Sequence, residues 1–499
     1  MTAIGARPTD AQAVPKRVAL ALAVALVWWL VDLALLRTGT PHPLDDLWED
    51  GLIARALLAG HGFWTPMLYP PLWAMRDPAT LTVPVLVHGP LLPLLLTPMV
   101  AVFGARAIDH VAWLAAAAAW LTAYFTARTL QRAAGATVAA VAVLLLTFSP
   151  ILLDAVNHSF SVVVGALALA IALDALLRRE PRGVTAGLAL GLGYLTRSEL
   201  MLVAPLVALA AGLAPRQWLH FGAAFLVCAV PWWAHHFAVV GSPFFNLSSY
   251  TVVGFSHAFP GSSLMRDFAL TPDRWPAFLQ SNLGALPPKW LESFPRALKR
   301  VVVTPGVLTG WLVGFGLFAW LPRPGYRRLA SAAMFIALIP VALMTVTVPQ
   351  PLYLVTFLPL FAIAASIGAG ALVEWFVPTV RIARWWPAVV VLLAFAGVIP
   401  TLLVARTEAR AARDLLASER AALAKVPATG VSPLFSDRPD FVAWTTGRPA
   451  LWMTSDEYDA LYPRFTAEHA ARPAGLPAVR DSNLTWFHDG HWAAGRRAR

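Results

Sequence analysis

The chain of 499 residues is 58% hydrophobic and only 13% charged, with a formal net charge of +11. A soluble domain has about 25% charged residues, so this composition excludes an ordinary soluble protein and predicts a polytopic membrane protein. The basic residues separate apolar segments instead of forming one patch, which argues against nucleic acid as a partner.

The first predicted element is a membrane span over residues 18–36, in which Asp32 is the one charged residue. A polar, basic segment, 1–17, precedes it, and no small-residue cleavage site follows its apolar core. This pattern is typical of a signal anchor and not of a cleaved signal peptide.

An acidic run, Asp45-Asp46-Leu47-Trp48-Glu49-Asp50, follows this span. Carboxylates at the boundary between lipid and water can hold a proton, a metal or a sugar hydroxyl. Asp45 and Asp46 are therefore candidates for a general base and a substrate-binding residue. The alternative is a helix N-cap worth about 1 kcal/mol, which needs one acid and not four. We expect Glu49 and Asp50 to form a solvated first helical turn, with binding of a divalent cation as the alternative.

The apolar stretch 83–103 contains His88 near its start and four prolines. Proline inside a helix removes a backbone hydrogen bond and bends the helix. We predict a helix that lies in the outer leaflet without crossing the membrane. The alternative, a twelfth span, would move every later basic cluster to the other side.

Arginine and lysine clusters between the apolar segments predict the topology, because cytoplasmic loops collect these residues. With all of them inside, about eleven spans result, with the N-terminus in the cytoplasm and the C-terminus outside. The predicted spans are 18–36, 107–127, 134–152, 160–177, 183–195, 199–213, 218–234, 301–321, 329–348, 353–372 and 386–404. Two of them, 183–195 and 199–213, are shorter than the ~20 residues that a membrane requires.

Three segments remain outside the membrane in this topology: 37–106, 235–300 and 405–499. The first two are loops of a transmembrane domain over 1–404. The third, 405–499, contains a helical stretch and short strand-like runs at 431–435 and 450–453, and is predicted to be a small soluble α/β domain.

Several polar residues at predicted span ends are candidates for a binding site. Asp154, Asn157 and His158 lie at the outer end of a span, where an interfacial position without function is the alternative. Arg197 lies between two short apolar segments, and a charge at membrane depth is expensive. Its guanidinium suits a phosphate, although Glu199 could simply neutralise it.

Four segments, in order, resemble the GT-C superfamily of integral-membrane glycosyltransferases, in particular its protein O-mannosyltransferase and lipid A aminoarabinose transferase branches. They are Leu44–Phe63, His88–Gly104, Leu195–Glu199 and Pro231–Phe244. The first is similar to the family's acidic pair followed by A-R-x-L-x-x-G-x-G-F, the third to its L-T-R/K-P-E turn. His235-His236 stands where the family usually has Arg-Asn, and Leu352-Tyr353 where it often has Arg-Tyr.

The resemblance implies an all-α GT-C fold in the cytoplasmic membrane and a sugar donor linked to polyprenyl phosphate. The acceptor would be a glycan, lipid or protein of the cell envelope. Asp45 aligns with the first acid of the family pair, which implies the base, and Asp46 would position acceptor hydroxyls. His88, Tyr353, Arg197, Asp154 and His158 are the expected substrate-binding residues.

No metal site is predicted, because the single cysteine excludes a cysteine-based one and no histidine–acid spacing forms a specific motif. A divalent cation at the acidic run stays open. The rival to an enzyme is a non-enzymatic transporter or lipid flippase. A transporter should carry charges midway along its spans, whereas here they cluster at span ends and in outer loops.

Overall fold

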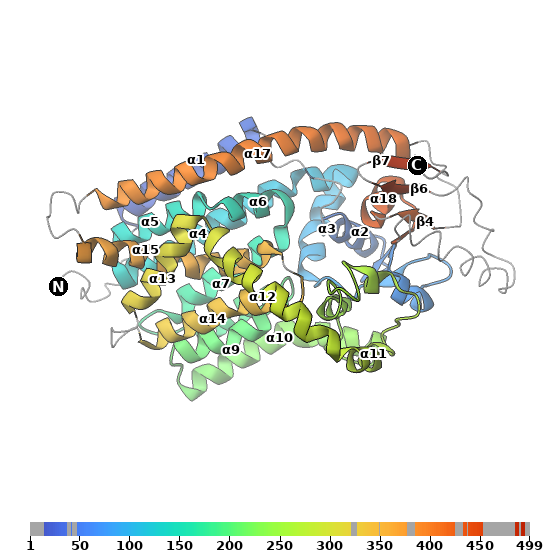
Figure 1. Cartoon of the computed structure of the whole chain (residues 1–499), viewed down its shortest axis with the longest axis horizontal. Coiled ribbons are helices and arrows are strands. Elements are labelled where there is room, and N and C mark those ends of the chain that lie inside the picture. Colours follow the sequence, from blue (N-terminus) through green and yellow to red (C-terminus); the bar gives the residue numbers. More distant parts are fainter. Residues whose placement is uncertain are drawn as a thin grey trace. The chain divides into compact units, whose positions relative to one another are not determined.

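The computed structural model describes residues 14–36, 41, 47–320, 327–348, 350–376, 385–424, 433–436, 438–452, 485–488 and 491–494. They form mostly helices with a few short strands (Figure 1). The chain divides into two compact units, each built from three segments. Unit 1 comprises 1–39, 111–235 and 287–408, and unit 2 comprises 40–110, 236–286 and 409–499.

Unit 1 is helical. Its first half contains α1 (Lys16–Val31) with a π-helical turn (Asp32–Leu36), α4 (Val111–Ala134), α5 (Ala136–Thr147), α6 (Pro150–His158), α7 (Phe160–Leu176), α8 (Gly183–Tyr194) and α9 (Leu200–Ala210). Its second half contains α13 (Val307–Trp320), α14 (Arg327–Val346), the 3-10 helix η7 (Pro351–Phe357) and α15 (Leu358–Phe376). Three further helices, α10 (Pro215–Val240), α12 (Leu286–Val303) and α17 (Trp386–Leu423), continue from one unit into the other.

Small residues let the helices of unit 1 approach closely. Helices α13 and α15 pack side by side, as do α4 and α7. A Cβ atom at Gly316 of α13 would lie 1.7 Å from the carbonyl oxygen of Ala364 of α15, so only glycine fits there. Such contacts are typical of helices that pack in a membrane, where close van der Waals contact replaces the hydrophobic driving force.

Among the described residues, five helices are long and apolar enough to cross a membrane, or up to seven if each of two bent pairs is one span. The bent pairs are α5 with α6, at 53°, and Leu283–Val303 with Val307–Ala319, at 94°. The chain is therefore a helical membrane protein. Each predicted span overlaps a helix, and the two short ones coincide with α8 and α9. The number of eleven crossings and the sidedness stay predictions.

Unit 2 combines short helices with three small sheets. Its helices are α2 (Leu47–Leu58), α3 (Leu91–Phe103), α11 (Trp275–Ser281) and α18 (Pro439–Thr446), with 3-10 helices at Pro70–Met75, Gly104–His110, Leu247–Val252, Ser263–Arg266 and Leu283–Ala285. Its strands are β1 (Trp64–Thr65), β2 (Met67–Leu68), β3 (Val83–Pro84), β4 (Leu434–Ser436), β5 (Ala450–Trp452), β6 (Thr485–His488) and β7 (His491–Ala494). Pairs β1–β3 and β6–β7 are antiparallel, and β2, β5 and β4 form a parallel sheet in that order.

The three segments that the charge pattern places outside the membrane overlap the three segments of unit 2, although residues 287–300 of the second belong to unit 1. In the three-stranded sheet, β2 from the first segment pairs with β5 from the third, with Met67 opposite Ala450. The predicted strand-like runs correspond to β4 and β5. The boundary between a transmembrane domain of 1–404 and a C-terminal domain of 405–499 stays a prediction.

The apolar stretch 83–103 is helical only in its second part. Val83 and Pro84 form β3, and α3 begins at Leu91. Of the four prolines, only Pro98 lies in the helix interior. By length and hydropathy, Leu91–Ala134 also passes as one long candidate span, so the predicted location of α3 in the outer leaflet stays a prediction.

Candidate functional site

The acidic run leads into α2 in unit 2. Asp45 and Asp46 lie outside the described residues, and Leu47 directly after them is the first residue of α2. Glu49 and Asp50 lie in its first turn, and each is only 3% exposed. The expectation of a solvated first turn was therefore wrong.

Aromatic residues from the C-terminal segment cover the same turn at Trp48. Trp48 is fully buried, and its ring lies 5.1 Å from Phe441 and 6.2 Å from Trp444, both on α18. Gly51 permits the contact, because a Cβ atom there would lie 2.8 Å from the Trp444 ring. The cover comes from a segment almost 400 residues away, so no local pattern around Glu49 could have predicted it.

Arg55, near the end of α2, fixes the helix to α18. Its Nη1 donates to the carbonyl oxygen of Trp444 at 2.7 Å, and its Cζ lies 3.3 Å from the centre of the Trp444 ring. Burial lowers the pKa of Arg55 to about 10, so the guanidinium stays charged at neutral pH. The first turn of α2 is thus held in a fixed place within unit 2.

Glu49 forms a buried hydrogen-bonded group with two residues of the same loop region. The Tyr69 hydroxyl donates to Glu49 Oε2 at 2.7 Å, and His88 Nε2 lies 2.9 Å from the same oxygen. Glu49 Oε1 is buried and has no hydrogen-bond partner within the described part of the chain. This group, Glu49, Tyr69 and His88, is called the Glu49 cluster below. A carboxylate with one unsatisfied oxygen can accept a hydrogen bond from a hydroxyl group.

The segment 236–286 supports His88. The Leu247 amide donates to the Leu86 carbonyl at 2.9 Å, and Asn246 Nδ2 donates to the Val87 carbonyl at 3.1 Å. His88, with 23% of its side chain exposed, is the most accessible member of the Glu49 cluster. Sequence reasoning named His88 but missed Tyr69, for which no motif or spacing gave a signal.

Arg197 belongs to a second group, in unit 1. Its Nε lies 2.8 Å from Glu199 Oε1, and its Cζ lies 5.0 Å from the centre of the Tyr353 ring. Thr356 Oγ1 donates to the same Glu199 oxygen at 3.4 Å. These four residues are called the Arg197 cluster. The structure thus brings together Arg197 and Tyr353, two predicted site residues 156 positions apart. Glu199 pairs with Arg197, as expected if Glu199 neutralises the arginine.

Helix α7 packs tightly against the Arg197 cluster at Gly165. A Cβ atom at Gly165 of α7 would lie 3.0 Å from Arg197 Cγ and 3.2 Å from Thr356 Oγ1. Glu199 is 3% exposed on its side chain and Arg197 is 19% exposed. The carboxylate is therefore enclosed, and part of the guanidinium remains accessible.

Asp154 and His158 lie one helical turn apart on α6. Helix α6 packs against α7 and against η7, the 3-10 helix that carries Tyr353 and Thr356. Asn157 between them is 2% exposed, and neither polar atom of its side chain has a hydrogen-bond partner among the residues described. A buried amide of this kind is costly unless something else satisfies it.

His235 and His236, which stand where the family usually has Arg-Asn, contact an aromatic ring and a main-chain carbonyl. The His235 ring stacks on Trp232 at 4.8 Å, and His236 Nδ1 contacts the Phe245 carbonyl. Within the described ranges, no three His, Cys, Asp or Glu side chains gather so that they could hold a metal ion. Whether Asp45, Asp46, the Glu49 cluster and the Arg197 cluster form one site stays a prediction.

Comparison with solved structures identifies the fold. The chain aligns with ArnT from Cupriavidus metallidurans bound to undecaprenyl phosphate at 18% identity and a TM-score of 0.51, over 89% of this chain and 87% of that one. It aligns with ArnT in the apo state at the same identity and TM-score, over 94% and 92%. The chain therefore shares the fold of these structures over most of its length.

An archaeal enzyme gives the same result. The oligosaccharyltransferase AglB from Archaeoglobus fulgidus, in complex with an inhibitory peptide and a dolichol-phosphate, aligns at 15% identity and a TM-score of 0.53. The alignment covers 86% of this chain and 64% of AglB, so the chain spans less than two thirds of that protein. No protein-family model matches the chain, and no curated protein matches it.

Proposed function

We propose that this protein is a membrane glycosyltransferase that moves a sugar from a polyprenyl-phosphate donor to a glycan, lipid or protein acceptor of the cell envelope. The observation that carries the proposal is the fold shared over 89% of the chain with an enzyme crystallised with undecaprenyl phosphate. AglB, with the same fold, has been crystallised with a dolichol-phosphate and with peptides. A transporter or lipid flippase is the alternative.

The donor phosphate is assigned to Arg197. Glu199 uses the Nε of Arg197, and the Tyr353 ring faces the guanidinium carbon, so the group is held in one orientation. An oriented guanidinium suits bidentate contact with a phosphate better than a mobile one. The isoprenoid tail would lie along the apolar helices. Asp154 and His158 on α6, which packs on η7, are proposed to contact the sugar or phosphate.

The acceptor side is assigned to the acidic run. Asp45 takes the proton of an acceptor hydroxyl, whose oxygen attacks the anomeric carbon of the donor. The bond from that carbon to the phosphate oxygen breaks, and polyprenyl phosphate leaves with the electron pair. This single displacement inverts the anomeric configuration. Asp46 and the Glu49 cluster, with the unsatisfied Glu49 Oε1, position acceptor hydroxyls.

A divalent cation could bind only with the acidic pair. AglB has been crystallised in a complex with Zn and sulfate. Here, the buried and unsatisfied Glu49 Oε1 is a suitable oxygen ligand, but the described residues provide no complete ligand set. Asp45 or Asp46 would therefore have to complete it. Such an ion would stabilise the charge on the departing phosphate.

The site is proposed to face the outer side of the cytoplasmic membrane. With the N-terminus inside and the C-terminus outside, the segments of unit 2 are extracytoplasmic. The positions of the basic clusters support this orientation, because arginine and lysine collect on the cytoplasmic side. The small α/β C-terminal domain belongs to the same side.

Transfer of a radiolabelled sugar from polyprenyl phosphate in purified membranes tests the proposal. Asp45→Asn should lower the rate by roughly 10²–10⁴, the usual contribution of a general base. Glu180→Gln is the matched control, since Glu180 is exposed and lies in a predicted cytoplasmic loop. Wild-type transfer by both Asp45→Asn and Asp46→Asn would remove the acidic run from the mechanism. No transfer from any donor by wild-type protein, with donor movement across vesicles instead, would establish the flippase.

A further inference from the structure

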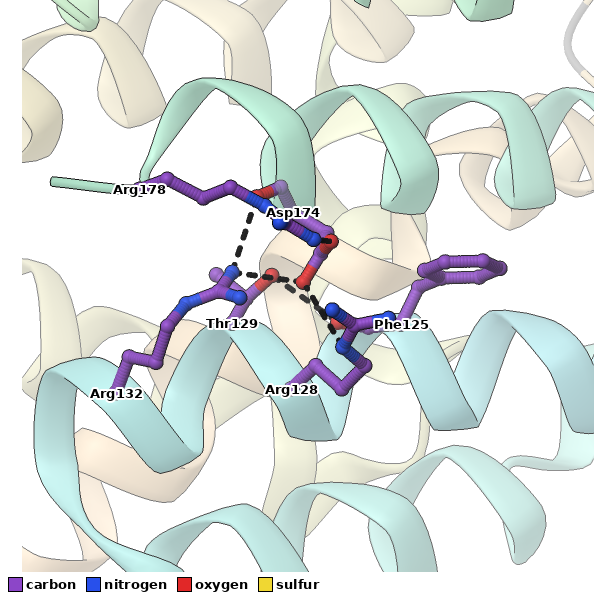
Figure 2. Close-up of polar contacts among 6 residues, drawn as sticks. All are labelled: Phe125, Arg128, Thr129, Arg132, Asp174 and Arg178. Carbon is purple, nitrogen blue, oxygen red and sulfur yellow. Dashed lines mark hydrogen bonds and ion pairs between the residues drawn. The ribbon is translucent and has the colours of Figure 1, made fainter. Parts of the chain in front are cut away.

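Asp174 of α7 lies at the centre of three arginines, as Figure 2 shows. Arg132 Nη2 lies 2.7 Å from Asp174 Oδ1, and Arg178 Nη2 lies 2.7 Å from Oδ2. Arg128 Nε lies 3.7 Å from Oδ1. Asp174 is 4% exposed on its side chain, whereas 34%, 18% and 21% of the Arg128, Arg132 and Arg178 side chains are exposed. These four residues are called the Asp174 cluster.

The Asp174 cluster has more positive charge than its structural role requires. Arg132 and Arg178 already satisfy both carboxylate oxygens, and they also donate to the main-chain carbonyl of Asp174 at 3.0 and 3.2 Å. One arginine would be enough to neutralise Asp174. Three guanidinium groups and one carboxylate leave a net charge of +2 (three minus one).

The arginines also keep donors that Asp174 does not use. A guanidinium has five N–H groups. Arg128 Nε lies 3.7 Å from Asp174 Oδ1, beyond hydrogen-bond distance, so this contact takes up none of its donors. Arg178 uses Nε and Nη2, which leaves Nη1. Asp174 therefore orients the three arginines but leaves an accessible, positively charged surface that fits the oxygens of a phosphate.

The face of α4 that carries this charge changes from aromatic to basic along the helix. Trp120, Tyr124, Arg128 and Arg132 are spaced by four residues, so they lie on one face, and all four are partly exposed. The Trp120 and Tyr124 rings stack at 6.1 Å, and Arg128 lies 5.6 Å from the Tyr124 ring. Aromatic residues next to arginines are typical of the depth at which lipid headgroups lie.

We propose that the Asp174 cluster binds the headgroup of an anionic phospholipid, with the acyl chains along the Trp120–Tyr124 face of α4. The charge of +2 matches a headgroup with two phosphates, as in cardiolipin. Arg179 and Arg182, which are exposed and follow Arg178 in the chain, extend the basic surface. A lipid fits better than a soluble anion because the aromatic face that leads to the arginines belongs to an apolar, membrane-type helix. This site is separate from the donor site of the proposed function.

The test uses the full chain in phosphatidylcholine nanodiscs that contain cardiolipin, with the retained lipid counted by native mass spectrometry. Arg128→Gln removes one charge and leaves Asp174 paired with two arginines. It should lower cardiolipin retention about five-fold, the effect of one basic residue near an anionic headgroup. Arg178→Gln should have a similar effect, so the result does not depend on how one variant folds.

Arg216→Gln is the control, because Arg216 is exposed at the start of α10 and belongs to another basic cluster on the same predicted side. It should leave cardiolipin retention unchanged. Equal losses for Arg128→Gln and Arg216→Gln would reduce the effect to general surface charge and overturn the proposal. Displacement of cardiolipin by millimolar inorganic phosphate would also overturn it, since the site would then take a soluble anion.

Discussion

Two buried carboxylates in the described part of unit 1, Glu199 and Asp174, pair with arginine, and they differ in the number of partners. Glu199 has one, Arg197, with Thr356 as a further hydrogen-bond donor. Asp174 has three arginines. Asp174 is 3% exposed and Glu199 4%, so burial does not distinguish them.

The difference shows how the same two residue types serve different purposes. One arginine and one carboxylate form a neutral pair, and such a pair mainly fixes the direction of the guanidinium. Three arginines around one carboxylate remain positively charged and partly exposed, so they attract an anion. The first arrangement suits a reaction site that needs an oriented group, and the second suits binding of a lipid headgroup.

Arg197→Gln should have the largest effect. It tests whether the neutral pair of Arg197 and Glu199 takes part in catalysis. The change leaves Glu199 buried without its arginine. Breaking a buried pair in this way lowers the free energy of unfolding by about 3–5 kcal/mol. Loss of an oriented charge on the leaving phosphate should also lower sugar transfer by about 10²–10³. Unfolding by denaturant in detergent micelles and the transfer assay measure the two effects.

Arg296→Gln is the control for this change. Arg296 pairs with Glu292 at 2.6 Å, but the two side chains are 60% and 40% exposed. Exposed pairs contribute about 0–1 kcal/mol, so this variant should be close to wild type in stability and transfer. An Arg197→Gln protein that is destabilised but has full transfer activity when folded would make the Arg197 cluster purely structural.

Asp174→Asn should have the next largest effect, and it tests the role of the carboxylate in the Asp174 cluster. It leaves three guanidinium groups close together without a counter-charge, and we expect a loss of about 2–3 kcal/mol, below the value for a fully buried pair because the arginines are partly exposed. The loss should shrink at high salt, since screening weakens repulsion between the arginines. A loss that does not depend on salt would mean that Asp174 acts through its hydrogen bonds alone.

The sequence predicted the helices of unit 1 well because membrane spans and basic clusters are local signals. The same signals define the segments predicted to lie outside the membrane, and their sidedness stays a prediction. Of the candidate site, Arg197 and Tyr353 were named, and the structure brings them together. The Asp174 cluster was seen only as basic residues at span ends, because an arginine count does not show which side chains turn toward one acid.

The burial of Glu49 and Asp50 could not be predicted. In the same turn, Trp48 packs on Phe441 and Trp444, which lie almost 400 residues away in the sequence. A first helical turn with acids is solvated unless a distant segment covers it. Tyr69 was missed because its hydrogen bond to Glu49 joins helix α2 to the residue before the 3-10 helix Pro70–Met75, and no motif links these two segments.

Glu49→Gln extends the comparison to a carboxylate whose partners are a tyrosine and a histidine, Tyr69 and His88. The amide keeps an oxygen that can accept from Tyr69 but loses the charge that attracts His88. We expect a loss of about 1–2 kcal/mol in unfolding free energy, the cost of an altered buried hydrogen bond. Tyr69→Phe removes only one donor and is the milder control. An unchanged unfolding transition in Glu49→Gln would mean that His88 does not depend on the carboxylate for its position.

Tyr353→Leu should have the smallest effect and tests how the neutral pair is oriented. Leucine keeps apolar volume but removes the ring that lies 5.0 Å from Arg197 Cζ, and such a cation–π contact is worth about 0.5–2 kcal/mol. If the ring orients Arg197 toward the donor phosphate, the KM for the polyprenyl-phosphate sugar should rise several-fold, with a smaller change in unfolding free energy.

Tyr124→Leu is the matched control, because the Tyr124 ring lies 5.6 Å from Arg128 in the Asp174 cluster. It should weaken lipid retention and leave KM unchanged. Equal KM values for both variants would contradict the proposal that Tyr353 orients Arg197 toward the donor phosphate.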